Sequence, residues 1–84
     1  MKPIKFTFHA RDQMAERGTN EADVEQAVRQ GLREPARAGK MLCRFNFSYN
    51  GTWQGKFYAV KQVAPVIKEV ADEIVVVTVY TFFF

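Results

Sequence analysis

Apolar residues recur with a helical spacing in the first third of this chain and with a strand-like alternation in the rest. Residues 4–8 alternate apolar and polar side chains, which predicts a short extended lead-in. Thr7 can then cap a helix over residues 8–17, and Gly18 can end it, because glycine accepts the left-handed conformation common at helix ends. The pattern therefore predicts a helix close to the start of the chain.

A second helix is predicted to begin after Asn20, whose side chain can cap it, and to end near Gly31. Asp23 stands where a capping-box carboxylate would lie. The apolar stripe of this helix has spacings of three and four residues and consists of Val24, Ala27, Val28 and Gly31. Residues 32–40 contain a proline, a glycine and four charges, which predicts a linker.

From residue 42 onward the pattern has the period of two that is typical of strands. In the first predicted strand, Leu42, Arg44, Asn46 and Ser48 form a mostly polar face that alternates with an apolar face of Cys43, Phe45, Phe47 and Tyr49. The pair Asn50-Gly51 predicts a hairpin turn, loosened by Gly55, into a second strand over residues 57–63.

The last part of the chain is strongly apolar. Pro65 cannot donate a ladder hydrogen bond and predicts a bulge or an edge position, after which the strand continues over residues 66–70. A final strand over residues 74–80 is apolar on both faces and is followed by the phenylalanines of residues 82–84. We expect these rings to fold over this protein's own sheet, or else to be covered by a second copy or a protein partner.

These elements predict an α+β fold in which two N-terminal helices pack on an antiparallel sheet of three, or at most four, strands. A chain of 84 residues has room for one core, so a single domain over residues 1–84 is expected. Cys43 has no partner cysteine and is expected to fill the core. The chain starts without an apolar leader, and its longest aliphatic run covers only residues 74–77, which predicts a cytoplasmic protein with no membrane segment.

The net charge of +3 favours acidic partners, such as nucleic acid or an acidic protein. Its distribution is uneven, because residues 35–61 contain no acid and carry five basic side chains: Arg37, Lys40, Arg44, Lys56 and Lys61. A basic patch over the predicted linker and first two strands is therefore expected. The chain has neither a nucleotide-binding glycine motif nor a metal-ligand motif, so no cofactor and no metal site are predicted.

His9 is the one histidine of the chain and the obvious candidate to move a proton, because imidazole ordinarily titrates near neutral pH. Arg17 lies two helical turns further on and could bind a phosphate group. Each residue also has a structural alternative. His9 could simply orient the first helix, and Arg17 could pair with Glu16 or Glu21.

On the sheet, Arg44 is a second candidate for phosphate binding, and Lys56, Tyr58 and Lys61 are candidates for substrate contact. Cations interleaved with aromatic rings are typical of single-stranded RNA recognition, since charge binds phosphate and rings stack on bases. The alternative is that these side chains are ordinary surface residues of a strand. Trp53, near the hairpin tip, either packs back on the sheet or anchors a partner.

Two segments resemble the bacterial domain-of-unknown-function 4258 family. The sequence HARDQMAERG, from His9 to Gly18, is similar to that family's opening motif H-A-x-x-R-M-x-x-R-G-I-S, and residues 75–80 are similar to its closing strand V-x-V-T-V-Y. Two departures occur: Gln13 stands where the family usually has arginine, and Thr19-Asn20 replaces Ile-Ser. The first removes a positive charge from the motif.

The family is in turn similar to the RelE and BrnT toxins, small folds in which helices pack on an antiparallel sheet. This resemblance implies a metal-independent endoribonuclease, the toxin of a toxin–antitoxin pair, that cleaves RNA, free or ribosome-bound, through attack of the ribose 2′-hydroxyl. It implies His9, Arg17 and Arg44 as candidate catalytic residues and an antitoxin protein as partner. The alternative function is a non-catalytic interaction module that docks a protein, or a second copy of itself, through the apolar C-terminal strand.

Overall fold

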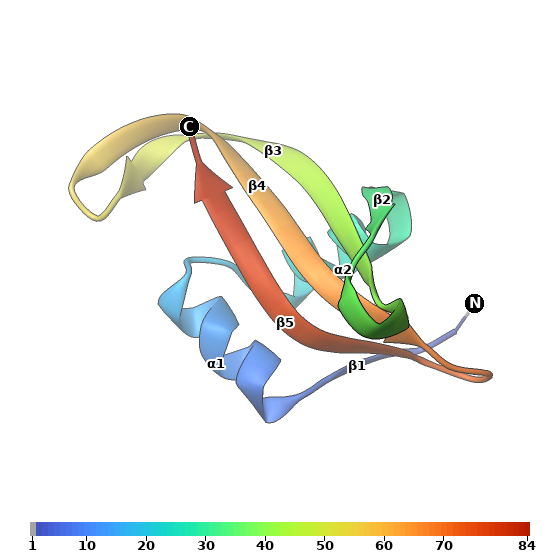
Figure 1. The fold of residues 1–84 in the computed structure, drawn as a ribbon. Helices are drawn as coiled ribbons and strands as arrows, with labels where there is room; N and C mark the ends of the chain where they lie inside the picture. Colours follow the sequence, from blue (N-terminus) through green and yellow to red (C-terminus); the bar gives the residue numbers. More distant parts are fainter. Residues whose placement is uncertain (1) are drawn as a thin grey trace.

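A computed structural model describes residues 2–84 of the chain (Figure 1). The elements of this part are β1 (Ile4–Phe6), α1 (Phe8–Glu16), α2 (Glu21–Gln30), β2 (Leu32–Pro35), the 3-10 turn η1 (Arg37–Gly39), β3 (Met41–Trp53), β4 (Lys56–Glu69) and β5 (Ile74–Phe83). The strands of this part form one sheet in the order β1-β5-β4-β3-β2. The β1 strand runs parallel to β5, and the other neighbours are antiparallel.

The predicted antiparallel sheet of three or four strands behind two N-terminal helices is therefore wrong. Within residues 2–84 the sheet has five strands, is mixed, and begins before the helices. The short lead-in pairs with β5, with Ile4 opposite Ile74, and the predicted linker contains β2, which pairs with β3. Pro35 is the last residue of β2, an edge strand of the sheet, and a proline without an N–H is tolerated in such a strand. The alternation of residues 4–8 predicted the extended conformation of β1 but not its place in the sheet, and β2 is too short for an apolar period to identify it.

The predicted hairpin between β3 and β4 is confirmed, but its turn lies further along the chain. Gln54 and Gly55 connect the strands with φ values of 50° and 81°, as the two central residues of a type I′ turn require. Asn50 also has a positive φ, and the register shifts between Ser48 and Gly51. Tyr49 and Asn50 thus lie opposite Ala59 alone, which is a β-bulge within β3 directly before Gly51.

Pro65 lies in β4, which is flanked by β3 and β5. Of the two predicted alternatives, the edge position is therefore wrong. A bulge does lie next to Pro65, but in the neighbouring strand: Val77 of β5 is the extra residue opposite the step from Val66 to Ile67. Pro65 is fully buried, which adds its ring to the apolar interior.

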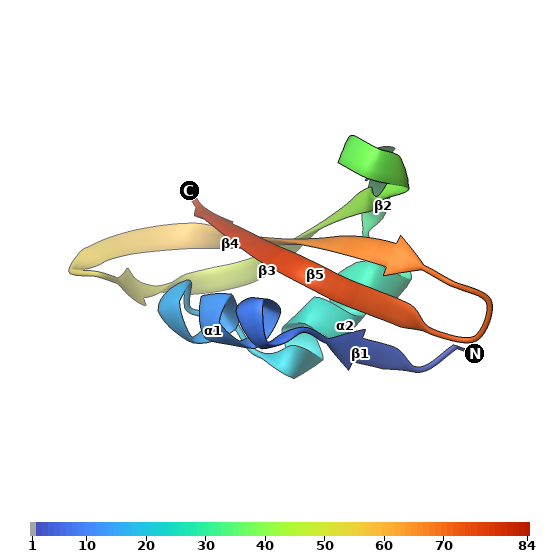
Figure 2. The same ribbon diagram turned by 60° about the horizontal axis from the view of Figure 1, so that its bottom comes forward.

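The predicted helix caps are confirmed. The Thr7 hydroxyl accepts a hydrogen bond from the Ala10 amide, and the Asn20 side chain accepts one from the Asp23 amide. Gly18, which follows the C-cap residue Arg17, has a φ of 71°. Both helices pack on the same side of the sheet, while η1 rises from the opposite side (Figure 2). We call these the covered face and the open face.

The core lies between the helices and the covered face. It consists of Ala10, Met14, Val24, Ala27, Val28, Cys43, Val63, Ile67, Ile74, Val76 and Val79. Cys43 is 0% exposed, which confirms it as a core residue, and burial raises the pKa of its thiol.

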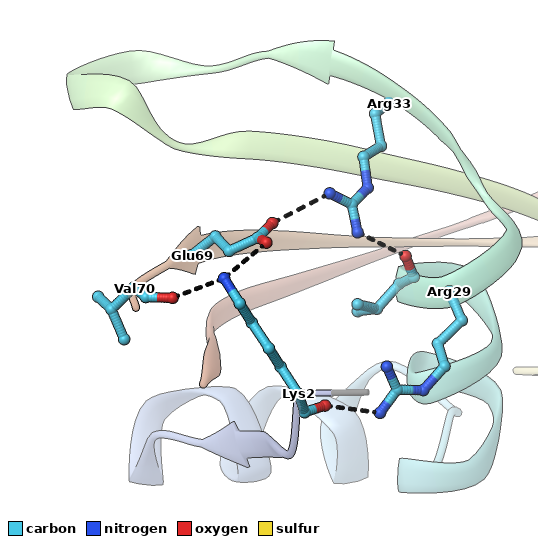
Figure 3. Close-up of polar contacts among 6 residues, drawn as sticks. Lys2, Arg29, Arg33, Glu69 and Val70 are labelled. Atoms are coloured by element: carbon cyan, nitrogen blue, oxygen red, sulfur yellow. Dashed lines mark hydrogen bonds and ion pairs between the residues drawn. The ribbon is translucent and has the colours of Figure 1, made fainter. Parts of the chain in front are cut away.

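A charged cluster ties the start of the chain to the end of β4 (Figure 3). The Lys2 ammonium donates to Glu69 at 3.0 Å and to the Val70 carbonyl at 2.8 Å. Arg33 also donates to Glu69, and Arg29 donates to the Lys2 carbonyl. Hydrogen bonding by Lys2, with help from Arg33, lowers the pKa of the exposed Glu69 carboxyl.

Candidate functional site

The edge of β5 changes partner halfway along its length. Strand β1 pairs with β5 only as far as Val76, and beyond that point α1 covers the edge. The Thr7 hydroxyl donates to the Val77 carbonyl, and the Val79 N–H donates to Oε1 of Gln13 at 2.8 Å. Arg17 donates to the Val79 carbonyl at 2.7 Å. Side chains of α1 and of its two cap residues, Thr7 and Arg17, therefore satisfy backbone groups that a neighbouring strand would otherwise bind.

This arrangement brings two of the predicted residues to the open side of β5. Nε2 of His9 lies 3.1 Å from Oγ1 of Thr78, and the Arg17 guanidinium lies 5.1 Å from the centre of the Tyr80 ring. The ion pairs considered for Arg17 do not form within residues 2–84, where Glu21 pairs with Arg11 instead.

Arg44 reaches the same strand from β3. Its guanidinium lies 5.8 Å from the centre of the Phe82 ring, which stacks near Tyr80 with the ring centres 6.5 Å apart. Arg44 also donates to Glu34 and to Gln62, so much of its charge is already paired. Arg17, with one backbone partner, has more free donors for an anion.

The result is a repeating arrangement along one strand. Three alternate residues of β5 each contact an imidazole or a guanidinium from another element. Alternate residues of a strand lie about 7 Å apart, so the contacts follow one another at about that spacing. We call this set the basic–aromatic strip: it comprises His9 with Thr78, Arg17 with Tyr80, and Arg44 with Phe82. His9 is exposed, as are the Tyr80 and Phe82 rings at 42% and 44%.

Hydrogen bonds behind His9 determine which of its nitrogens carries the proton. The Val79 N–H can only donate, which identifies the Gln13 atom it meets as the amide oxygen. The Thr78 hydroxyl donates to that same oxygen. Having used its proton, the hydroxyl oxygen can only accept from Nε2 of His9. The neutral imidazole therefore carries its proton on Nε2 and leaves Nδ1 as a free base.

The predicted substrate residues lie elsewhere. Lys61 is 7% exposed, and its ammonium donates to Asp23 at 2.9 Å and to the Gly18 carbonyl at 3.3 Å, between the covered face and the helices. Lys56 lies 5.6 Å above the Tyr58 ring near the hairpin turn. None of the three joins the strip.

Aromatic side chains near the hairpin form a separate cluster. Phe83 stacks on Trp53 with ring centres 5.2 Å apart, and Tyr49 and Tyr58 contact the same ring. A methyl group on Gly18 would lie 2.7 Å from the Trp53 ring. Trp53 therefore packs back on its own chain, which is the first of the two alternatives considered for it.

The C-terminal phenylalanines extend the sheet. Phe84 exchanges two backbone hydrogen bonds with Val60, which prolongs the pairing of β5 with β4. Phe83 points into the aromatic cluster, while Phe82 and Phe84 stay 44% and 58% exposed. The expected packing over this protein's own sheet thus holds for one ring of the three.

A groove adjoins the strip on the open face. Its volume is about 460 Å³. Leu42, Val66 and Val77 line its apolar floor, and the segment from Pro35 to Lys40 forms one wall. Thr78 and Tyr80 belong both to the groove and to the strip.

Sequence reasoning missed Thr78, Tyr80, Phe82 and Gln13. The alternation of residues 78–82 was a usable signal, because the even positions point away from the buried Val79. No pattern in the sequence links Gln13 to β5, since that contact spans 66 residues.

No helix of the described residues 2–84 is long and apolar enough to cross a bilayer, and the same residues hold no cluster of three metal-ligating side chains.

A comparison with known protein families agrees with the resemblance of residues 9–18 and residues 75–80, the two segments that bring His9 and β5 together. The family model of a domain of unknown function, DUF4258, matches residues 6–81. No curated protein and no solved structure matches the chain.

Proposed function

Since the chain belongs to the DUF4258 family, for which no function is established, we propose on the basis of its site that it is a metal-independent endoribonuclease acting on single-stranded RNA. The observation that carries the proposal is the basic–aromatic strip. Exposed rings on an open sheet face stack bases in several RNA-binding folds, and guanidinium groups bind phosphate. The opening motif resembles that of a family similar to the RelE and BrnT toxins. On this basis the protein would be the toxin of a toxin–antitoxin pair, and the antitoxin would be its protein partner.

The proposed reaction starts at His9. Its Nδ1 takes the proton of a ribose 2′-hydroxyl, and the 2′-oxygen attacks the adjacent phosphorus. The bond from phosphorus to the 5′-oxygen breaks, and that oxygen takes a proton from water. The products are a 2′,3′-cyclic phosphate and a free 5′-hydroxyl end. Arg17 stabilises the charge that develops on the phosphoryl oxygens, with a smaller contribution from Arg44 because Glu34 already pairs with it.

The test is incubation of the purified protein with single-stranded RNA in the presence of a chelator, with and without ribosomes. Loss of a general base lowers the rate by about 10²–10⁴-fold, which is the effect expected for His9→Ala. Arg17→Ala is expected to be slow as well, and its matched control is Arg11→Ala, which removes an exposed guanidinium from the same helix. Intact RNA with the wild-type protein in both conditions would exclude the proposal.

The second candidate function, docking of a protein on β5, is favoured by the exposure of Tyr80, Phe82 and Phe84. Because α1 occupies the edge of β5 up to Thr81, a partner or second copy would have to bind the open face, where these three rings are exposed. Replacing both Phe82 and Phe84 by serine spares the Phe83 cluster and should abolish such a complex. Light scattering that finds the wild-type chain monomeric, alone and with its genomic neighbour's product, would contradict this function.

A further inference from the structure

The groove beside the strip combines features that suit one class of ligand. Its floor of Leu42, Val66 and Val77 is apolar, while Arg37 and Lys40 stand at the wall that η1 raises over the open face (Figure 2). Among the described residues that line the groove there is no Asp or Glu. A ligand that fits must therefore present an apolar body and a negative charge.

Size and shape narrow the class further. Pockets of about 300–1,000 Å³ hold small organic ligands, and the groove has about 460 Å³. The Tyr80 ring on one side offers a surface on which a flat group can stack. A nucleobase is flat and apolar on both faces, and its nucleotide carries a phosphate within reach of side chains as long as Arg37 and Lys40.

We propose that this groove binds one unpaired nucleobase, with Arg37 and Lys40 holding the phosphate attached to it. The inference rests on the proposed function in that it names the substrate element bound beside the strip. Thr78, which lines the groove, is also the residue bonded to His9. A base in the groove thus sets its ribose close to the imidazole, and cleavage is expected to prefer some bases over others.

The experiment is an NMR titration of the ¹⁵N-labelled full chain with the four 3′-nucleoside monophosphates and, separately, with inorganic phosphate. Nucleotides should produce saturable shifts of the Leu42 and Val66 amides, with at least a threefold difference in affinity between the best and the worst base. Inorganic phosphate should shift only Arg37 and Lys40.

A matched pair of substitutions tests the location. Ala36 lies in the groove wall with extended backbone angles that any residue adopts, so Ala36→Phe fills the groove without strain. It should weaken nucleotide binding at least tenfold. Ala59→Phe places the same ring at an exposed position of β4 outside the groove and should bind like the wild type.

The proposal is overturned if nucleotides cause no saturable shift at the floor, if inorganic phosphate reproduces their shifts, or if Ala36→Phe binds as the wild type does. Equal shifts from a polyglutamate peptide would assign the groove to an acidic protein and also overturn it. Because the titration needs no cleavage, the two proposals fail separately. If the protein binds nucleotides but leaves RNA intact, only the proposed ribonuclease activity is contradicted. If it cleaves RNA but binds no nucleotide, only the proposed role of the groove is contradicted.

Discussion

Both faces of the sheet place cations against aromatic rings, but the cation of the covered face is buried and paired, whereas the cation of the open face keeps free hydrogen-bond donors. On the covered face, Lys61 lies 5.8 Å from the ring centres of Phe47 and Tyr49, and Asp23 and a carbonyl hold its ammonium. On the open side, Arg17 lies against the exposed Tyr80 and keeps free donors. Residue type alone does not separate a structural cation from a ligand-binding one, whereas burial and fixed partners do.

The largest effect on stability should come from Gly18, which lies between the two helices against the Trp53 ring of β3. Its φ of 71° costs an L-residue about 1–2 kcal/mol, and a Cβ would also overlap the Trp53 ring at 2.7 Å. Gly18→Ala should therefore lower the free energy of unfolding by about 2–4 kcal/mol, measured by urea denaturation.

Gly55→Ala is the matched control for Gly18→Ala. Gly55 has a φ of 81°, but a Cβ there would meet no atom within 4 Å. The control should lose only the backbone component of about 1–2 kcal/mol. Equal losses in the two variants would show that the packing of Trp53 on Gly18 contributes nothing.

A smaller effect is expected for the cations themselves. Lys61→Met removes a buried donor and leaves Asp23 and the Gly18 carbonyl without it, which should cost about 1–3 kcal/mol of unfolding free energy. Arg44→Met breaks a half-exposed pair with Glu34 and should cost about 0–1 kcal/mol. If both substitutions lower the free energy of unfolding by the same amount, Lys61 on the covered face is no more structural than Arg44 on the open face.

Sequence patterns located most local features of the fold, because those features depend on neighbouring residues. Thr7, Asn20 and Gly18 were identified as helix signals from chemistry within four residues of each position. The alternation of residues 4–8 identified the extended conformation of β1 but not its pairing with β5, which lies about 70 residues away in the sequence. Strand β2 was missed because it is four residues long and its place in the sheet depends on pairing with β3.

The site was predicted less well, since its contacts are long-range. His9, Arg17 and Arg44 were selected by residue type. His9 and Arg17 reach β5 because α1 packs at its edge, and Arg44 reaches it across β4 from β3. Lys61 was misplaced on a substrate surface because its ion pair with Asp23 spans 38 residues, and a strand pattern does not report such a pair.

The charged cluster around Glu69 predicts a modest dependence of stability on pH. Lys2 and Arg33 lower the pKa of Glu69 below its ordinary value of 4.5. The stabilisation is therefore fully present above pH 4.5 and is lost as the pH falls through the lowered pKa of the folded protein. Glu69→Gln should be less stable than the wild type at pH 7, and the difference should shrink in acid. A difference that grows in acid would contradict the sign of this shift.

The smallest effect in energy concerns the imidazole on the open side. Since His9 is the single histidine, the ¹⁵N spectrum of the labelled protein contains one pair of imidazole signals. At a pH where the ring is neutral, the proton should lie on Nε2, because the Thr78 hydroxyl already donates to Gln13. Thr78→Val removes that acceptor and should shift the two signals toward the tautomer mixture of free histidine.

Thr81→Val is the matched control, because the Thr81 hydroxyl donates to the Arg17 carbonyl and has no contact with His9. It should leave the imidazole signals unchanged. A wild-type ring protonated on Nδ1 would contradict the hydrogen-bond order from Val79 through Gln13 and Thr78 to His9. The proposed base would then be the nitrogen that Thr78 occupies, and the open side would hold its imidazole for structure alone, as the covered face holds Lys61.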